Sequence, residues 1–238
     1  MMSYDSVGFR ARRIMGGLDR NGDRDMHREV TWTHPFLDAV VHFLPDDANR
    51  VVDIGCGQGI GGALSRIYRN PVKLVGLDAF RPYLDSLRQL TMYSDLIRID
   101  LSRTPRLPFR RNSFDVGLAL EVIEHLPMKE GKALLADLKE TCSRVIVSTP
   151  NEFFDQDTYD QNPFQSHRSF WHVRDFESIG FEVYGVGGVR GLGTNVGYAL
   201  GRLTSLFPRA STQLLAVWDR RGRVSPLIGR KRGPHSHL

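Results

Sequence analysis

The chain of 238 residues contains only two cysteines, Cys56 and Cys142. Two cysteines cannot build the disulfide framework that holds small secreted domains together, which favours a reducing compartment. The chain also has no run of about 18 apolar residues, the length that a membrane-spanning helix needs. Its first residues are polar and basic and lack the apolar core of a signal peptide. We therefore expect a protein of the cytoplasm with no membrane span.

The excess of positive charge lies in the C-terminal tail. The formal net charge is +5, but residues 220–238 hold six Lys and Arg residues and no acid, so the rest of the chain is close to neutral. This composition is typical of a solvated, mobile terminus, and the alternative is an arm that touches a polyanion such as RNA. The charge by itself does not indicate a nucleic-acid-binding protein.

The apolar content and its spacing predict the fold class. With 41% hydrophobic residues the chain can bury the core of one medium-sized domain. Short apolar runs predict strands at 51–54, 72–78, 96–99, 114–120, 144–148, 181–189 and 213–219. Helical spacing predicts helices at 32–44, 60–68, 80–91, 128–141 and 173–179. The alternation predicts an α/β fold, a Rossmann-like, doubly wound, mostly parallel seven-stranded sheet with an antiparallel edge.

The domain organisation follows from segments without clear periodicity. We expect a polar N-terminal segment and cap helix over 1–45, one main domain over 46–219 and a disordered basic tail over 220–238. Segment 151–171 is rich in aromatic residues, and segment 190–209 is rich in glycine and then helical; both are expected to be lids or insertions. A loop as long as 151–171 is usually functional. The alternative is that its aromatic side chains only pack on the core.

One glycine-rich stretch organises the predicted site. In Val51–Leu64 an apolar run leads into glycines and continues as an apolar helical pattern, which predicts a strand, a tight turn and the start of a helix. Glycine allows positive φ and lets a ligand approach the backbone. The free N–H groups at the start of the helix face the same space. We therefore expect a ligand with polar or anionic groups here.

Acidic residues stand at the ends of four of the predicted strands, at the edge of the sheet where ligands bind: Asp53, Asp78, Asp100 and Glu121. Four acids at one edge disfavour a bare polyphosphate and favour a ligand that offers hydrogen-bond donors. No Gly-Lys-Ser/Thr of a phosphate-binding loop is present either. A dinucleotide site is the rival, because Gly57-x-Gly59-x-x-Gly62 matches that fingerprint. That register leaves Asp53 without a role, whereas Asp53-x-Gly55-x-Gly57-x-Gly59 includes it.

Over about residues 48–185 the ordered motifs resemble the class I S-adenosylmethionine-dependent methyltransferases. The motifs are Val52-Asp53-Ile54-Gly55-Cys56-Gly57-Gln58-Gly59, Gly76-Leu77-Asp78, Asp100-Leu101, Phe114-Asp115 and Glu121-Val122-Ile123-Glu124-His125-Leu126. The resemblance implies S-adenosylmethionine as the cofactor, with its methionine part on the loop of Gly55, Cys56, Gly57 and Gly59, which Asp53 holds. It also implies ribose hydroxyls on Asp78 beside Ala79, the adenine amino group on Asp100, the adenine ring against Leu101, and a contact from Glu121.

Glu121, Glu124 and His125 have the spacing i, i+3, i+4, which places them on one face of a helical turn. Together with His167, two carboxylates and two imidazoles would form a divalent-metal site, and mixed nitrogen and oxygen ligation suits Mn²⁺, Co²⁺ or Zn²⁺. This arrangement, with Ser148-Thr149-Pro150-Asn151, resembles the small-RNA 3′-terminal 2′-O-methyltransferases and more loosely the quinone-biosynthesis O-methyltransferases. Many class I methyltransferases with the same motif need no metal; in those, Glu121 would contact cofactor or substrate, and His125 would pack or act as a base.

Three functions remain open at this point. The first is methyl transfer to a hydroxyl of a small-molecule acceptor, with His125 and then His167 as the candidate bases and Glu121 beside them. The second is metal-dependent 2′-O-methylation of RNA, in which Glu121, Glu124, His125 and His167 would hold the ion. The third is a protein that binds the cofactor without catalysis.

Overall fold

The computed structural model describes residues 35–104, 106–152, 160–189, 205–222, 224 and 227. The strands are β1 (Arg50–Ile54), β2 (Lys73–Asp78), β3 (Asp95–Arg98), β4 (Phe114–Leu120), β5 (Cys142–Pro150), β6 (Glu182–Val189) and β7 (Ser211–Asp219). The helices are α1 (Pro35–Phe43), α2 (Ile60–Tyr68), α3 (Arg81–Gln89), α4 (Met128–Thr141) and α5 (Val173–Glu177). Two short 3₁₀ turns are η1 (Ile123–His125) and η2 (Pro208–Ala210). Most predicted elements agree with these bounds to within a few residues.

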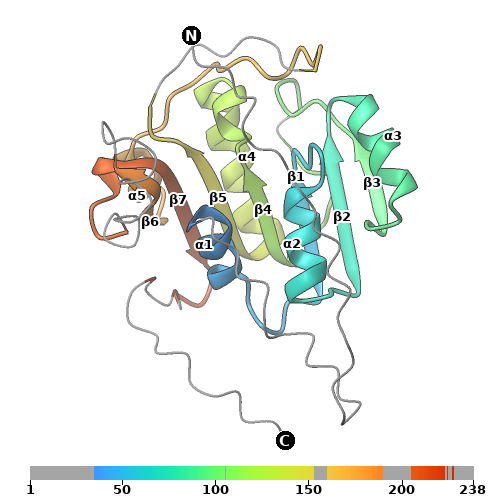
Figure 1. The fold of residues 1–238 in the computed structure, drawn as a ribbon, viewed down its shortest axis with the longest axis horizontal. Coiled ribbons are helices and arrows are strands. Elements are labelled where there is room, and N and C mark those ends of the chain that lie inside the picture. The colour runs from blue at the N-terminus through green and yellow to red at the C-terminus, as the bar shows by residue number, and fades with distance from the viewer. Residues whose placement is uncertain are drawn as a thin grey trace, which may run out of the picture. The chain divides into compact units, whose positions relative to one another are not determined.

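The seven strands form one sheet in the order β3-β2-β1-β4-β5-β7-β6, as Figure 1 shows. Strands β1 to β5 pair in parallel, and β7 runs antiparallel to both of its neighbours, β5 and β6. The predicted α/β fold with a mostly parallel sheet and an antiparallel edge is confirmed. β5 and β7 are longer than predicted because their ends pair with neighbouring strands. Cys142 pairs with β4, Thr149 and Pro150 pair with β7, and Ser211 pairs with β6.

Helices cover both faces of the sheet (Figure 1). On one face α4 and α5 pack in a core cluster that includes Ile54, Leu138 and Phe176. On the other face α1 and α2 pack in a second cluster with Val51 and Leu118. Neighbouring residues of β1 therefore point to opposite cores, as expected of a parallel strand that is buried on both sides. This packing presents the carboxyl ends of β1, β2, β3 and β4 at one edge, where the predicted site residues lie.

Some predictions concern residues outside the described ranges. These are the N-terminal segment up to residue 34, residues 153–159, the predicted helix in 190–204 and most of the basic tail. In the described part of 190–209, residues 205–209 form a turn and the beginning of η2. Among the described residues, no helix has the length and apolar character needed to cross a membrane.

Candidate functional site

The glycine loop (residues 55–59) joins the end of β1 to the start of α2. Gly55, Gly57 and Gly59 have φ angles of 60°, 50° and 91°, the left-handed region that glycine tolerates. A Cβ on Gly55 would lie 2.5 Å from Val122, and one on Gly59 would lie 2.7 Å from a leucine of α3, so protein packing closes both positions. Among the described residues, a Cβ on Gly57 would meet only the Gly55 carbonyl oxygen, at 3.8 Å, and would otherwise face open space. Gly57 is therefore the position at which a ligand can approach this backbone.

Asp53 lies beneath the glycine loop and is 2% exposed. Its Oδ2 accepts a 2.6 Å hydrogen bond from the Tyr93 hydroxyl, and the Gly62 N–H at the start of α2 also donates to the carboxylate. Burial raises the pKa of Asp53 to about 7, and both hydrogen bonds oppose that rise. A Cβ on Gly62 would collide with the Tyr93 hydroxyl, so this glycine makes room for a side chain of the protein. Asp53 thus supports the loop, and its partner Tyr93 was not identified from the sequence.

Asp78, at the end of β2, faces the loop from the neighbouring strand. Its Oδ2 accepts a 2.8 Å hydrogen bond from the Gly57 N–H, and its Oδ1 accepts one of 2.8 Å from the Phe80 N–H. Burial raises the pKa of Asp78, and these backbone bonds oppose the rise. Ala79 lies between Asp78 and Phe80 on the same turn. The Cys56 thiol is buried, which raises its pKa, so it is a packed side chain of the loop and not an activated thiol.

Asp100 and Leu101 follow β3, the next strand towards the edge of the sheet. Asp100 Oδ1 accepts hydrogen bonds from the N–H and the hydroxyl of Ser102, at 3.0 and 2.6 Å, and Oδ2 lies 3.3 Å from Arg103 Nε. Leu101 is 7% exposed and belongs to the core cluster beneath α4. The structure therefore places both residues in a turn at the predicted edge, with the leucine anchored in the core.

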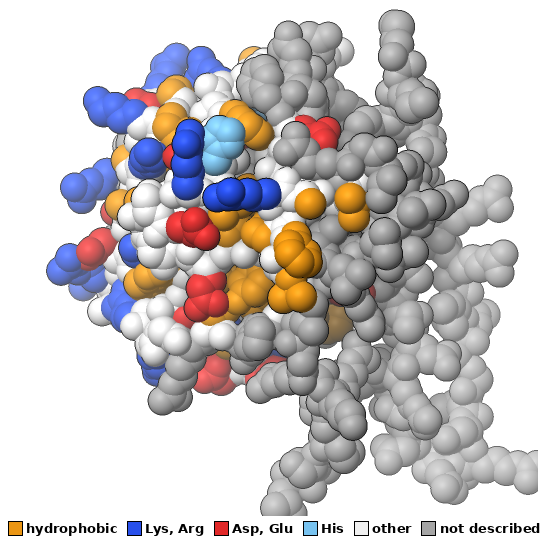
Figure 2. Space-filling model, turned by 90° about the vertical axis from the view of Figure 1, so that its left-hand side faces the viewer, with side chains coloured by type: hydrophobic (Ala, Val, Ile, Leu, Met, Phe, Trp, Pro, Cys, Tyr) orange, Lys and Arg blue, Asp and Glu red, His pale blue; other side chains and the backbone are white. Residues whose placement is uncertain are grey.

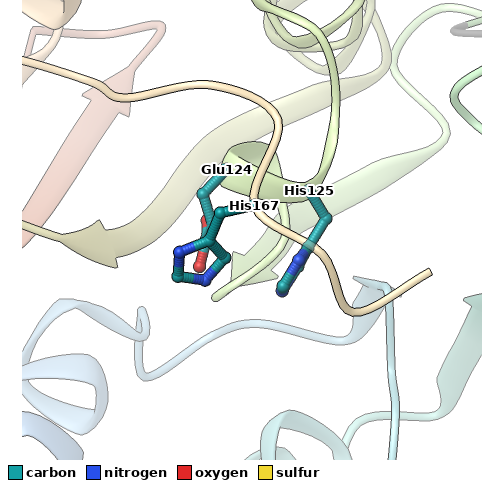
Figure 3. A group of neighbouring side chains, drawn as sticks. All are labelled: Glu124, His125 and His167. Carbon is teal, nitrogen blue, oxygen red and sulfur yellow. The ribbon is translucent and has the colours of Figure 1, made fainter. Parts of the chain in front are cut away.

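Three predicted residues lie together beyond the end of β4: Glu124, His125 and His167 (Figure 3). Their possible ligand atoms all lie within 4.8 Å of one another, and the two imidazole centroids are 5.1 Å apart. Glu124 and His125 come from η1, and His167 comes from a segment that we call the strap (residues 160–172). Figure 3 shows the three side chains side by side. The tertiary structure therefore joins the two halves of the predicted metal motif.

Glu124 is a buried carboxylate, and one of its two oxygens accepts no hydrogen bond from the described residues. Its side chain is 3% exposed, and Oε2 has no hydrogen-bond partner among the described residues. The Thr149 side chain donates to the carboxylate. Burial, and then the charge of Glu121, raise the pKa of Glu124 well above its usual range. Such a group needs a proton or a cation beside it, because a lone buried charge is costly.

His125 is held in one tautomer. Its Nδ1 lies 3.3 Å from the carbonyl oxygen of Ser166, which can only accept, so we assign the proton to Nδ1 and the lone pair to Nε2. Burial lowers the pKa of His125 to about 4, and the neighbouring His167 contributes to the decrease. The imidazole is therefore neutral near pH 7, the form that accepts a proton or binds a metal.

Glu121 lies outside this group of three, whereas a group of four was expected. It precedes η1 with a φ of 56°, so the helical spacing from Glu121 to His125 does not hold. Left-handed backbone is uncommon for a residue with a Cβ and marks a constrained position. Its Oε1 accepts a 2.6 Å hydrogen bond from the Ser148 hydroxyl, and the Gln213 side chain also donates to the carboxylate. Glu121 therefore acts on Glu124 through its charge.

Three polar side chains at and just after the end of β5 support the site. Ser148 bonds Glu121, and Thr149 bonds Glu124. Asn151 Nδ2 donates to the carbonyl oxygens of Ser211 and Pro208, at 2.8 and 3.0 Å, and so ties the end of β5 to the start of β7. Each polar residue of the predicted Ser-Thr-Pro-Asn segment therefore holds a different part of the site or of the sheet in place.

The strap also reaches the glycine loop. Asp160 Oδ2 accepts hydrogen bonds of 3.1 Å from Gln58 Nε2 and from the Tyr83 hydroxyl. These residues line a hollow of about 730 Å³ beside α3, with Phe80 and Gln161. Since the strap carries both Asp160 and His167, one segment borders the predicted cofactor loop and the Glu124 group.

Comparisons with known proteins agree with this architecture. Residues 51–144 match the family described as a methyltransferase domain. A structure of the complex between the Haloferax volcanii Trm112 methyltransferase activator and a methyltransferase matches at 15% identity over 81% of this chain and 90% of that chain, with a TM-score of 0.54. An S-adenosylmethionine-dependent methyltransferase from Mesorhizobium loti matches at 15% identity, 76% and 94% coverage and a TM-score of 0.51. The methyltransferase domain of bacterial CtHen1-C matches at 22% identity, 78% and 96% coverage and a TM-score of 0.50. No curated protein matches the chain in sequence.

Proposed function

We propose that this chain, with its match to a methyltransferase domain, is a class I, S-adenosylmethionine-dependent methyltransferase. Its methyl group would go to a hydroxyl oxygen of an acceptor bound at Glu124, His125 and His167. The observation that carries the choice of oxygen is the buried Glu124 carboxylate beside two imidazoles, with Oε2 unpartnered among the described residues. A hydroxyl becomes a stronger nucleophile when a base accepts its proton or when a bound cation lowers its pKa. This group of side chains has the composition for either.

The glycine loop has the features that S-adenosylmethionine requires. Among the described residues Gly57 faces open space, and Gly59, the residue before α2, provides no side-chain cap, so backbone groups other than the Gly62 N–H remain available to a ligand. We propose that Gly57, Asp78 and Asp100 hold the cofactor, and that Asp53 keeps the loop in place from below. When bound, the cofactor supplies a methyl group on a positively charged sulfur.

A divalent cation fits the Glu124 group. One buried carboxylate oxygen that has no partner in the described part of the chain and two imidazoles form a mixed nitrogen and oxygen donor set, which suits Mn²⁺, Co²⁺ or Zn²⁺. When bound, the cation supplies positive charge that lowers the pKa of an acceptor hydroxyl. Glu124 and the neutral His125 would hold the ion together with His167. In a metal-free enzyme His125 instead accepts the hydroxyl proton at Nε2.

We propose a hydroxyl-bearing small molecule as the first acceptor class. RNA is the second, because the Glu-x-x-Glu-His motif at 121–125 and the later His167 resemble the metal motif of the small-RNA 2′-O-methyltransferases. Three of these residues, Glu124, His125 and His167, lie together. Lys and Arg side chains also gather on one side of the face shown in Figure 2, and Arg168, next to His167, is exposed. RNA binding should weaken steeply with salt because phosphate contacts release counterions. Binding of an uncharged small molecule should not.

The test measures transfer of a labelled methyl group by the full chain to panels of hydroxyl acceptors and short RNAs, with EDTA or with added Mn²⁺ or Co²⁺. We expect E124Q and H167A to lower kcat by about 100-fold or more, the scale of proton-transfer catalysis. Binding of S-adenosylhomocysteine should be retained. E177Q, an exposed glutamate of α5, is the matched control and should behave as wild type. Undiminished turnover by both E124Q and H167A would contradict the proposed site.

A further inference from the structure

The three side chains of the proposed site are carried by two irregular segments. Glu124 and His125 lie in η1, which has only three residues, and His167 lies in the strap, where residues 163–172 contain no helix or strand. Neither segment has a hydrogen-bonding ladder of its own to fix its position. The geometry of the group therefore depends on contacts between the two segments, and this inference rests on the proposed function of the group.

Two backbone hydrogen bonds connect the strap to the turn. The N–H groups of Arg168 and Ser169 both donate to the carbonyl oxygen of Glu124, at 2.7 and 3.0 Å. They place the residue after His167 directly against the backbone of a residue of the group. A side-chain anchor beside these two bonds further restricts the position of the segment.

Ser169 and Trp171 provide that anchor. The Ser169 hydroxyl donates to the Ile123 carbonyl oxygen at 3.2 Å and accepts from Trp171 Nε1 at 3.0 Å. Trp171 Nε1 also lies 3.3 Å from the same carbonyl oxygen. The three groups thus form a connected set of hydrogen bonds on the residue before Glu124, in surroundings where such bonds reinforce one another.

The indole ring is itself fixed by the core. Trp171 is 0% exposed, and its ring centroid lies 5.2 Å from that of Phe176. A Cβ on Gly131 of α4 would lie 2.6 Å from its Cζ2, so the helix approaches the ring as closely as a glycine permits. The indole N–H therefore projects from a rigid side chain, and the position of the strap is set by α4 and α5.

We infer that Ser169 and Trp171 are positioning residues that hold the strap on η1 and so keep His167 beside Glu124 and His125. Neither residue belongs to the group itself. Removal of groups that hydrogen-bond metal ligands directly changes metal affinity by about 10- to 100-fold, and we expect a loss on the same scale when the support of the neighbouring backbone is removed. Even a displacement of about 1 Å in a binding group is enough to impair a site.

The test uses Co²⁺ as the probe, because its visible absorption reports on the ligands around it. The full chain is titrated with Co²⁺ as wild type, S169A, S169T and W171F. We expect S169A and W171F to bind Co²⁺ about 10-fold or more weakly, with an altered spectrum. S169T, which keeps the hydroxyl, should restore the wild-type values. F114L, a buried substitution in β4 whose side chain packs with Phe109, is the control: it should lower stability and leave Co²⁺ binding unchanged.

The outcomes separate the positioning role from the proposed function. Wild-type Co²⁺ affinity and spectrum in both S169A and W171F would overturn the positioning role and leave the proposed site standing. Absence of Co²⁺ binding by the folded wild type would overturn the proposed cation, and the positioning role with it. S169A removes a single oxygen from a half-buried side chain, so it keeps the test valid if W171F fails to fold.

Discussion

Replacement of Tyr93 by phenylalanine tests whether the carboxylate beneath the glycine loop is a buried charge. The Tyr93 hydroxyl donates a 2.6 Å hydrogen bond to Asp53 Oδ2, and Asp53 is 2% exposed. Y93F removes that donor and keeps the ring against Gly62. The Gly62 N–H remains as a hydrogen-bond donor to the carboxylate.

The size of the effect should depend on pH. Burial raises the pKa of Asp53 to about 7, so the folded protein holds this proton more tightly than the unfolded chain does. The resulting stabilisation is complete below the unfolded pKa of about 4 and is lost as the pH rises through about 7. Loss of the Tyr93 bond, which opposes the rise, moves the folded pKa of Asp53 higher still. A hydrogen bond contributes about 1 kcal/mol when both groups are neutral and about 1.5 to 3 kcal/mol when one is charged. Y93F should therefore reduce the free energy of unfolding by about 1 kcal/mol at about pH 5 and by about 1.5 to 3 kcal/mol at about pH 8.5.

The assay is urea denaturation followed by circular dichroism at the two pH values. Comparison of variant and wild type at the same pH cancels the titration of other groups. Y184F is the matched control, since the Tyr184 hydroxyl donates a 2.7 Å hydrogen bond to Glu182 at an exposed position. It should change stability by less than about 0.5 kcal/mol at either pH. An equal loss for Y93F at both pH values would refute the reasoning about Asp53.

Two further contrasts test the loop and a helix end. G57A should bind S-adenosylhomocysteine at least about tenfold more weakly by calorimetry, because its methyl group projects into the open space of the loop, and it should lose about 1 to 2 kcal/mol of stability from its left-handed φ. G62A should instead be destabilised chiefly through its collision with Tyr93, which circular dichroism will show as a lower Tm. The Arg220 guanidinium donates to three carbonyl oxygens at the C-terminus of α4. R220A should therefore lower the free energy of unfolding, measured in urea, by about 1 to 2 kcal/mol, and R221A should leave it unchanged.

The fold could be predicted from the sequence because its signals are local. Strands such as β4 are near-continuous apolar runs, and alternation of such runs with helical patterns is sufficient to indicate a doubly wound sheet. The edge that carries Asp53, Asp78 and Asp100 could be predicted for the same reason, because the carboxyl ends of parallel strands meet on one side. The longer extent of β5 and β7 could not, since it depends on pairing between distant segments.

The sequence alone determined which residue types stand at the site, and the tertiary structure decided what each one does. Spacing placed Glu121 with Glu124 and His125, but a left-handed backbone at Glu121 turns its carboxylate to Ser148, and the group of three is completed by His167 from the strap. Likewise the glycines look equivalent along the chain, and only their surroundings distinguish them. A Cβ on Gly57 would face open space among the described residues, whereas Gly62 accommodates the Tyr93 side chain. The physical reason is that periodicity and turn chemistry are properties of neighbouring residues. The partner of a buried group, such as Tyr93 for Asp53 at 40 residues' distance, depends on which side chain the folded core brings to it.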